Sequence, residues 1–178
     1  MATRVASRDG QLKDLSAALD AMRRIVRALG VSSRTAEHTV GVTGAQLLVL
    51  QQLEDAPARS LNELAQRTFT HQSTVSVVVD RLVARRFVKR ERSRDDARRI
   101  LLTLTASGRG ALRKAPPPAQ TRLIEALGGL PPKQLKGLAV ALTAAVSEMG
   151  LAAQPAGMFF EETRAAARPR RKSAGGTR

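Results

Sequence analysis

Residues 60–108 read SLNELAQRTFTHQSTVSVVVDRLVARRFVKRERSRDDARRILLTLTASG, and three consecutive signals in this stretch decide the fold. The first is a capping box, Ser60-Leu61-Asn62-Glu63, in which the Ser60 hydroxyl accepts a hydrogen bond from the Glu63 backbone and the Glu63 carboxylate reaches back. We expect this box to open a short helix. The inner face of that helix would consist of Leu61, Leu64 and Ala65.

The second signal is another helix, predicted after a turn near Phe69 and Thr70, with Thr70 able to cap it. Its apolar residues fall at helical spacing on one side: Val75, Val78, Val79 and Leu82. The third signal is a change of period to two strands, residues 87–91 and 100–104, with the charged loop 92–99 between them. Two helices joined by a tight turn and followed by a hairpin form a winged helix-turn-helix, whose second helix fits the major groove of DNA.

This stretch resembles the MarR family of bacterial transcription regulators. The wing of that family reads Asp-x-Arg, three residues, Leu-x-Leu-Thr, two residues and Gly. The chain matches every specified position, with Asp96, Arg98, Leu102, Leu104, Thr105 and Gly108.

The helix pair is also similar to that of the family, at Leu64-Ala65, Ser73-Thr74-Val75 and Asp80-Arg81-Leu82, and the resemblance extends from about Leu12 to Met149. The chain departs from the family at Val77, where a polar or basic residue is common. The set of base contacts is therefore expected to differ.

Short side chains at the start of the recognition helix leave room for close approach to bases, and these are Gln72, Ser73, Ser76 and Val77. Val77 can touch a thymine methyl group. The residues predicted to contact phosphate are Thr70, Thr74, Arg81 and Arg85, although both arginines could instead pair with Asp80. His71, in the first turn, is either a DNA contact or simply exposed. The competing interpretation is that this whole face is only solvated.

The resemblance implies that Arg98 of the wing enters the minor groove, with Asp96 two residues before it holding the guanidinium in one orientation. Arg94 and Arg99 are expected to contact phosphate. The alternative is that the loop acts only as an electrostatic cushion.

Composition agrees with a polyanionic partner, because the 178-residue chain has a formal net charge of +15. Nucleic acid and an anionic membrane surface both fit this charge, and so does an arginine-rich genome. The chain has no Cys, which excludes disulfides, a thiol nucleophile and the thiol-sensing mechanism known in part of the MarR family. No leading apolar run or stretch of membrane-spanning length occurs, so we expect a cytoplasmic protein without a membrane partner.

Helices are also predicted on both sides of the winged helix-turn-helix. Before it, an apolar stripe runs from Leu12 to Leu29, with Gly30 and Gly41 breaking the pattern. A second capping box, Thr43-Gly44-Ala45-Gln46, opens a helix that Asp55-Ala56-Pro57 ends. The inward residues of this helix are Leu47, Leu48, Leu50 and Leu53. Arg59-Ser60 is expected to form a very short strand against the wing.

After the wing, Thr105 can cap a helix reaching about Lys114, and Pro116-Pro117-Pro118 separates it from the next. The apolar side of that next helix consists of Leu123, Ile124 and Leu127. Pro131-Pro132 opens a last helix, which is apolar around much of its circumference and is therefore expected to be buried on more than one side. Residues 151–178 are predicted to form a mobile basic tail.

The predicted fold class is mainly α with a small β-wing: a winged helix-turn-helix, residues 41–108, and a helical dimerisation region, residues 11–40 and 109–150, after a flexible start at 1–10. No sheet covers the apolar stripes of the first and last helices. The family resemblance implies that they interlock between two subunits, with Leu15, Leu19, Leu138 and Leu142 in or near the interface of a homodimer. A monomer with a self-contained helical core is the alternative.

The predicted function is a dimeric, sequence-specific transcription regulator, most often a repressor in this family, acting on a palindromic operator in double-stranded DNA. The alternative is a winged helix that coats DNA without specificity or binds other proteins. The resemblance also implies a small aromatic acid as ligand, in a cleft between the helix-turn-helix and the dimerisation helices. That cleft is expected to be mainly aliphatic, with an Arg or His38 as partner for the carboxylate.

The sequence does not predict an enzyme, a cofactor or a metal site. It lacks a Gly-rich phosphate loop and a nucleophile motif, and its two histidines are His38, in a predicted polar loop, and His71. Asp95 and Asp96 lie among arginines and are better interpreted as salt-bridge partners.

Overall fold

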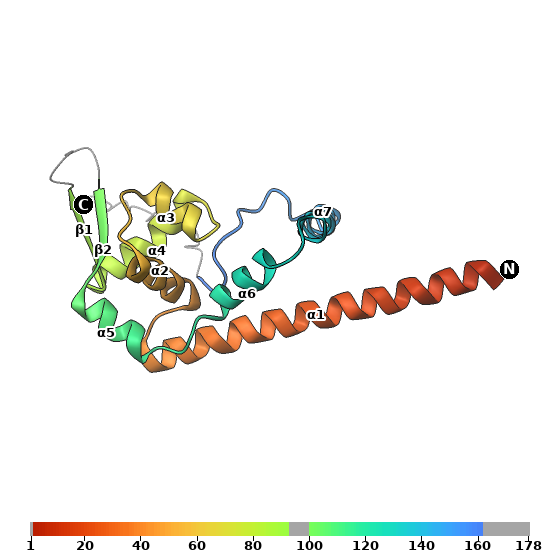
Figure 1. Ribbon diagram of the computed structural model, residues 1–178, viewed down its shortest axis with the longest axis horizontal. Coiled ribbons are helices and arrows are strands. Elements are labelled where there is room, and N and C mark those ends of the chain that lie inside the picture. Colours follow the sequence, from red (N-terminus) through yellow and green to blue (C-terminus); the bar gives the residue numbers. More distant parts are fainter. Residues whose placement is uncertain (1, 93–99, 162–178) are drawn as a thin grey trace, which may run out of the picture.

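The computed structural model describes residues 2–92 and 100–161 of the chain, with the side chains of 9–91 and 100–161. A mainly helical chain carries a two-stranded antiparallel sheet (Figure 1). In chain order the elements are α1 (Ala2–Val40), α2 (Gly44–Asp55), α3 (Leu61–Arg67), α4 (Gln72–Ala84), β1 (Val88–Arg92), β2 (Ile100–Leu104), α5 (Ala106–Lys114), α6 (Ala119–Gly128) and α7 (Pro132–Glu148).

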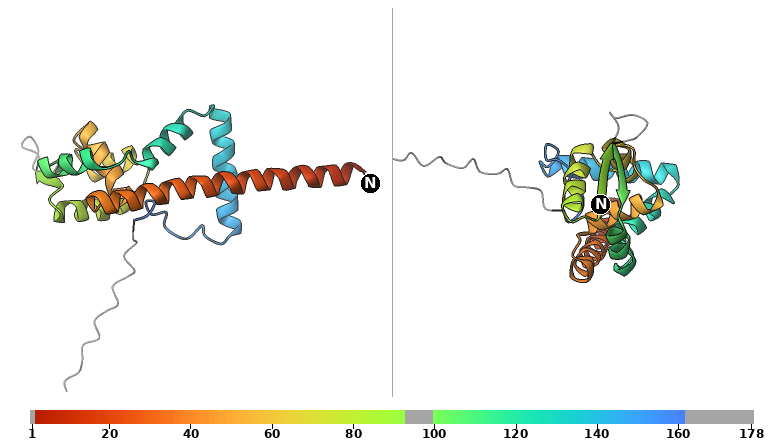
Figure 2. Two further views of the ribbon diagram at one scale, coloured as in Figure 1. Left: turned by 90° about the horizontal axis from the view of Figure 1, so that it is seen from below. Right: turned by 90° about the vertical axis from the view of Figure 1, so that its left-hand side faces the viewer.

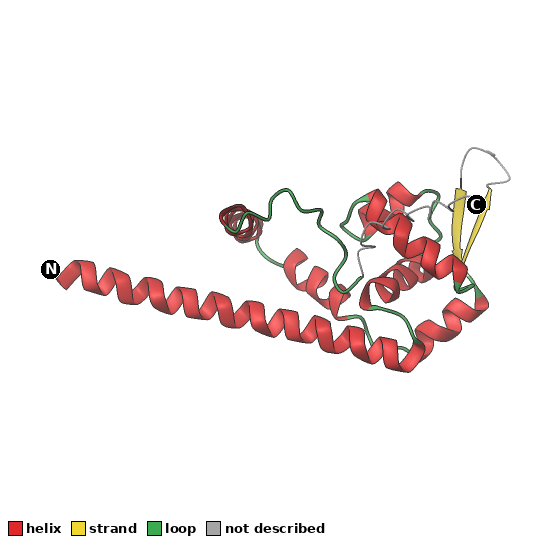
Figure 3. Cartoon of the chain, turned by 180° about the vertical axis from the view of Figure 1, so that it is seen from behind, coloured by secondary structure: helices red, strands yellow, loops and turns green. Residues whose placement is uncertain are grey.

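The elements form a head and two projecting helices. Helices α2 to α5 and both strands pack at one end of the molecule around the C-terminal part of α1, while the N-terminal part of α1 extends far from them (Figures 1 and 3). Helix α7 stands apart from the head and runs across the direction of α1 (Figure 2). The predicted fold class is therefore confirmed.

The core of the head is aliphatic and centres on α2, which is buried nearly all round. Its buried apolar residues are Ala45, Leu47, Leu48, Val49, Leu50 and Leu53. Helix α4 adds the four residues of its predicted inner face, and all four are fully buried: Val75, Val78, Val79 and Leu82. This arrangement fixes α4 firmly against the head and leaves its opposite face to solvent.

Helix α1 differs from the sequence-based prediction at both ends. It passes through Gly30 without a break, and it includes residues 2–10, which were expected to be a flexible segment. A glycine inside a helix costs only about 1 kcal/mol relative to alanine, and the surrounding turns offset that amount. The helix ends before Gly41, whose φ of +71° is the left-handed conformation that glycine adopts readily.

Three of the four predicted helix caps are confirmed. Thr43 accepts from the Gln46 N–H at 3.2 Å, Ser60 from the Glu63 N–H at 3.0 Å, and Thr105 from the Gly108 N–H at 3.0 Å. The Glu63 carboxylate reaches back to the N–H of Arg59 instead of Ser60. The prediction for Thr70 is wrong, because the N-cap of α4 is His71, and within the described residues no side chain caps this helix.

The wing pairs Val88 with Leu104 at its base and Arg92 with Ile100 at its outer end. A single bridge between Ala58 and Leu102 adds a third chain segment, one residue before the short strand expected at Arg59-Ser60. The hairpin is therefore tied to the end of α2 as well as to α4.

Residues 151–161, here called the strap, do not extend away from the molecule as the predicted tail would. The strap leaves α7 and returns to the head, where Met158 is buried in the core and Gln120 Nε2 donates to the Phe159 carbonyl at 3.1 Å. The prediction of a mobile tail is wrong for these residues, and residues 162–178 lie outside the described part of the chain. The strap side chains that contact the head follow no periodic pattern in the sequence.

The sequence predicted that α7 is buried on more than one side, and the described part of the single chain does not bury it. None of its residues is buried by the part of the chain that the structure describes. Its largest apolar side chains remain exposed, and so does the predicted stripe on the N-terminal part of α1.

Candidate nucleic-acid interface

The turn of the helix-turn-helix is held by hydrogen bonds that end α3. The Thr68 hydroxyl donates to the carbonyls of Leu64 and Ala65, and the Thr70 N–H donates to Ala65 at 3.0 Å. Phe69 has a φ of +52°, which is unusual for a residue with a bulky side chain and allows the chain to reverse toward α4. The angle between α3 and α4 is set by these bonds and by the buried valines.

The residues predicted to read bases lie on the face of α4 that points away from the core. Gln72 and Ser73 are exposed, Ser76 is half-buried, and Val77 is exposed although it is apolar. Thr70 and Thr74, predicted phosphate contacts, are half-buried, and His71 is exposed at the start of the helix. The structure thus exposes His71, Gln72, Ser73 and Val77, and it partly covers Thr70, Thr74 and Ser76.

The two arginines predicted to contact phosphate, Arg81 in the last turn of α4 and Arg85 directly after the helix, are both engaged within the protein. Arg81 forms an ion pair with Glu161 of the strap. Arg85 donates to the Gly41 carbonyl after α1, and its guanidinium lies 5.1 Å from the centre of the Phe87 ring. Asp80, considered as a partner for both arginines, instead pairs with Arg90 of β1 at 3.3 Å.

The wing loop was predicted to carry four DNA contacts, Arg94, Asp96, Arg98 and Arg99, and all four lie outside the described residues. The strands on either side of the loop are described, and their backbone pairing places both ends of the loop at the outer end of the hairpin. The wing motif ends at Gly108, and the structure shows why this position requires glycine. A Cβ atom there would collide with the Phe87 carbonyl.

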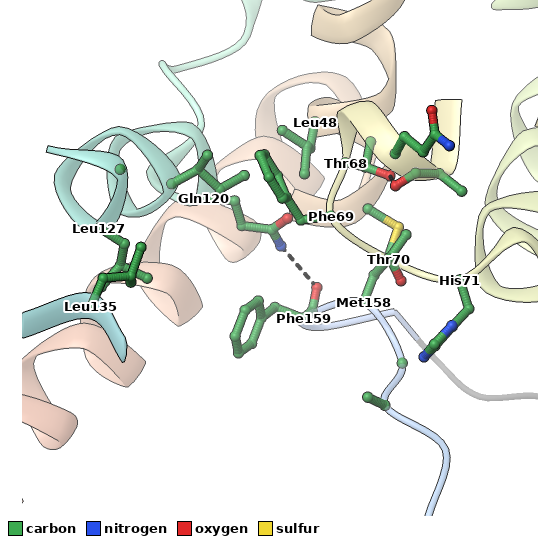
Figure 4. Close-up of a pocket in the computed structure, with 16 residues that line it drawn as sticks. Leu48, Thr68, Phe69, Thr70, His71, Gln120, Leu127, Leu135, Met158 and Phe159 are labelled. Atoms are coloured by element: carbon green, nitrogen blue, oxygen red, sulfur yellow. Dashed lines mark hydrogen bonds between the residues drawn. The ribbon is translucent and has the colours of Figure 1, made fainter. Parts of the chain in front are cut away.

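A cavity of about 790 Å³ adjoins the interface behind the turn of the helix-turn-helix (Figure 4). It opens between the α3–α4 turn, α6, the start of α7 and the strap. Its walls are mainly apolar, with Leu48, Phe69, Ile124, Leu127, Leu135, Met158 and Phe159. The polar side chains around it are Gln66, Thr68, Thr70, His71 and Gln120. The cavity lies between the helix-turn-helix and the helical region, as predicted.

The cavity differs in composition from the predicted cleft. Phe69 and Phe159 contribute rings to a lining expected to be aliphatic. His38 does not line the cavity, since it is exposed on α1 instead of lying in a loop. Among the lining residues that the structure describes, His71 carries the one ionisable side chain.

Sequence reasoning missed the strap residues that line this cavity and touch α4. A signal was present, because Phe159 and Phe160 are two of the four phenylalanines of the chain and follow Met158 directly. Such a concentration of large apolar side chains in an aromatic-poor chain is typical of a segment that packs against a core.

The described residues include no candidate metal site and no membrane-spanning helix. Within residues 2–92 and 100–161, no cluster of three or more His, Cys, Asp or Glu side chains is arranged to hold a metal ion. In the same part of the chain, no helix combines the length and apolar character needed to cross a membrane.

The helix pair with its exposed polar face and the hairpin beside it define a winged helix-turn-helix protein of the DNA-binding class. Residues 40–99 match the family model described as MarR family. The match covers the helix-turn-helix and the first strand of the wing, so this part of the chain is of the MarR family type. No curated protein sequence is significantly similar to the chain.

Solved structures show the same fold. Sco3205, a MarR family transcriptional regulator from Streptomyces coelicolor in complex with DNA, is 23% identical with a TM-score of 0.51, covering 78% of this chain and 90% of its own. The transcriptional regulator BldR from Sulfolobus solfataricus is 22% identical with a TM-score of 0.50, covering 77% of this chain and 97% of its own.

Proposed function

We propose that the protein is a homodimeric, sequence-specific DNA-binding regulator that represses transcription from a palindromic operator. The observation that carries this proposal is the surface of α4. One face is locked into the core by four fully buried side chains, while Gln72, Ser73 and Val77 are exposed on the other. A rigid helix that presents short side chains on an open face is suited to the major groove.

The alternatives considered for this face remain a solvated surface, non-specific DNA coating or a protein contact. An operator-binding protein of this kind typically prefers its site over bulk DNA by about a thousand-fold or more. A competition titration with a labelled fragment of the protein's own promoter and unlabelled bulk DNA separates these functions. A preference of that size supports the proposal, and equal binding assigns the protein to the non-specific class.

Dimerisation is supported by apolar side chains that the single chain leaves uncovered. The exposed fractions are 55% for Leu15, 40% for Leu19, 36% for Leu138 and 41% for Leu142. Within the described residues, α7 has no buried position at all, although its sequence is largely apolar. A partner chain that covers both helices would remove this surface from water, at about 25 cal/mol per Å².

A two-fold dimer would also place two copies of α4 in successive major grooves, roughly 34 Å apart. This geometry explains how a recognition helix that presents only a few side chains can reach useful affinity for DNA. It also predicts a palindromic site. Binding of DNA by Sco3205, a protein of the same fold, is in keeping with this role.

We further infer that a small organic ligand binds in the cavity beside the interface and relieves repression. A volume of about 790 Å³ is large enough for a ligand with one or two rings. Phe69 and Phe159 provide aromatic contacts, and His71 can pair with the carboxylate of an aromatic acid. Because Thr70 and His71 lie at the start of α4, a bound ligand would bias the position of the recognition helix.

The ligand proposal is tested by titration calorimetry against a panel of phenolic acids, with the DNA affinity measured in parallel. An acid that releases heat and weakens operator binding supports the proposal. The proposal fails for this class of compounds if none of them does both.

A further inference from the structure

Glu161, the last described residue of the strap, carries a largely buried charge. The Glu161 side chain is only 5% exposed and has two partners on the head. The Thr43 hydroxyl, at the start of α2, donates to one carboxylate oxygen at 2.6 Å, and Arg81 of the recognition helix pairs with the other. A buried carboxylate is stable only when its partners satisfy it, so the strap and Arg81 hold each other in place.

The residues before Glu161 fix the path of the strap. Met158 is buried in the core, and Gln120 holds the Phe159 carbonyl (Figure 4). Phe160 has a φ of +59°, and its ring lies over Gly30 of α1. A Cβ atom on Gly30 would stand 3.5 Å from that ring, an ordinary van der Waals distance, so the ring packs closely against α1. These contacts place Glu161 beside Arg81.

The ion pair limits what Arg81 can do for DNA. Its side chain is 30% exposed and lies on the flank of α4, next to the face predicted to read bases. A guanidinium binds carboxylate and phosphate oxygens through the same donors. A DNA phosphate at this position would have to compete with Glu161 for Arg81.

The strap also connects Arg81 with the cavity. Residues 156–159 form one wall of that cavity, directly before Phe160 and Glu161. A ligand packed against Met158 and Phe159 would add contacts that hold the strap on the head. It would thereby hold Glu161 on Arg81.

We propose that the strap is autoinhibitory, in that its Glu161 withholds Arg81 of the recognition helix from DNA phosphate, and that a ligand in the cavity strengthens this hold. The inference rests on the proposed function, because it assumes that α4 binds DNA. It assigns a regulatory role to a chain segment that follows the dimerisation helices.

The test compares Glu161→Gln with Glu54→Gln in the full chain. Both substitutions remove one negative charge, but Glu54 is exposed on α2, away from the proposed DNA and dimer surfaces, so the second variant controls for the change in net charge. Affinity for operator and bulk duplexes is measured between about 0.05 and 0.5 M salt. One additional phosphate contact steepens the slope of log affinity against log salt by about 0.9 unit and strengthens binding by up to about tenfold near 0.1 M salt.

We expect Glu161→Gln to show this gain and the steeper slope, and Glu54→Gln to show neither. In an Arg81→Ala background, Glu161→Gln should have no effect on affinity, because the competing guanidinium is absent. Met158→Ala, which loosens the strap without changing charge, should raise affinity in the same direction. Hydrogen exchange of the amides of residues 156–161 reports strap release in each variant without reference to DNA.

Faster hydrogen exchange of the strap without a gain in DNA affinity overturns the inference. A gain in DNA affinity that persists in the Arg81→Ala background also overturns it. So does a result in which neither Glu161→Gln nor Met158→Ala changes the hydrogen exchange of the strap or the DNA affinity. Failure of the proposed function appears differently, because the wild-type protein would then bind operator and bulk duplexes equally or bind neither at the lowest salt concentration. In the first case the comparison of variants still decides the inference, and in the second case the inference fails as well.

Discussion

Helices α4 and α7 have similar apolar content but opposite surroundings. The apolar face of α4 contains four side chains with an exposed fraction of zero, whereas no residue of α7 is buried by the described part of its own chain. Both helices follow the same amphipathic rule, by which apolar side chains leave water wherever a partner surface exists. Helix α4 meets its partner within the chain, and the uncovered surface of α7 is the reason for the proposed dimer.

The largest expected effect is on stability, and it is seen by replacing one leucine with alanine in each helix. Leu82→Ala in α4 removes a fully buried side chain and leaves a cavity, so it should lower the free energy of unfolding by about 2–5 kcal/mol. Leu138→Ala in α7 should leave the head stable and change the dependence of unfolding on protein concentration. Urea unfolding at several protein concentrations measures both effects. Equal losses that do not depend on concentration would contradict the comparison.

A charge on α7 should separate the chains. Leu138 is 36% exposed in one chain, so Leu138→Glu is compatible with a folded monomer, but a dimer would have to bury the carboxylate without a partner. The dimer dissociation constant should rise by at least about a hundredfold, and operator affinity should fall with it. Light scattering at micromolar concentration gives the mass of each form. A wild-type protein with the monomer mass would refute the role of α7.

On the exposed face of α4, Gln72→Ala should alter base preference without changing stability. Loss of a bidentate contact to adenine would reduce discrimination at one base pair by about 1–3 kcal/mol. Asn62→Ala, at an exposed position in α3, serves as control. Binding of each variant to a set of single-base operator mutants measures the profile. A Gln72→Ala protein with the wild-type profile would show that this residue does not read bases.

The smallest effect is expected in the wing. Arg98→Ala should weaken binding to A·T-flanked operators several-fold more than to G·C-flanked operators, because a narrow A-tract minor groove attracts arginine most strongly. Asp96→Ala should weaken binding less, since it frees Arg98 without removing its charge. Arg113→Ala, an exposed arginine of α5, controls for charge. Equal losses on the two operators would show that the wing senses only charge.

The head could be predicted from the sequence because its signals are local. Periodicity gave the buried face of α4, and the change of period before Val88 gave the wing. Hydroxyl caps at Thr43 and Ser60 marked two helix starts correctly. In each of these places the residues that determine the structure lie within about one helical turn or along one hairpin.

Long-range contacts account for what the sequence did not reveal. Glu161 meets Thr43 and Arg81, which are 118 and 80 positions away in the chain, and no periodic pattern connects them. Helix α1 likewise passes through Gly30, where the Phe160 ring, 130 positions later in the chain, packs beside it. Arg85 was interpreted as a phosphate contact from its charge, and its bond to the Gly41 carbonyl depends on where α1 ends.

Selection of bound fragments from a random DNA library tests the central claim most directly, because it requires no knowledge of the operator. If α4 reads bases in a two-fold dimer, the selected fragments will share a palindrome whose half-sites are centred about one helical turn apart, roughly 34 Å. Gln72→Ala will then change bases within each half-site. Fragments without a common sequence, or a single half-site with no repeat, would contradict the account.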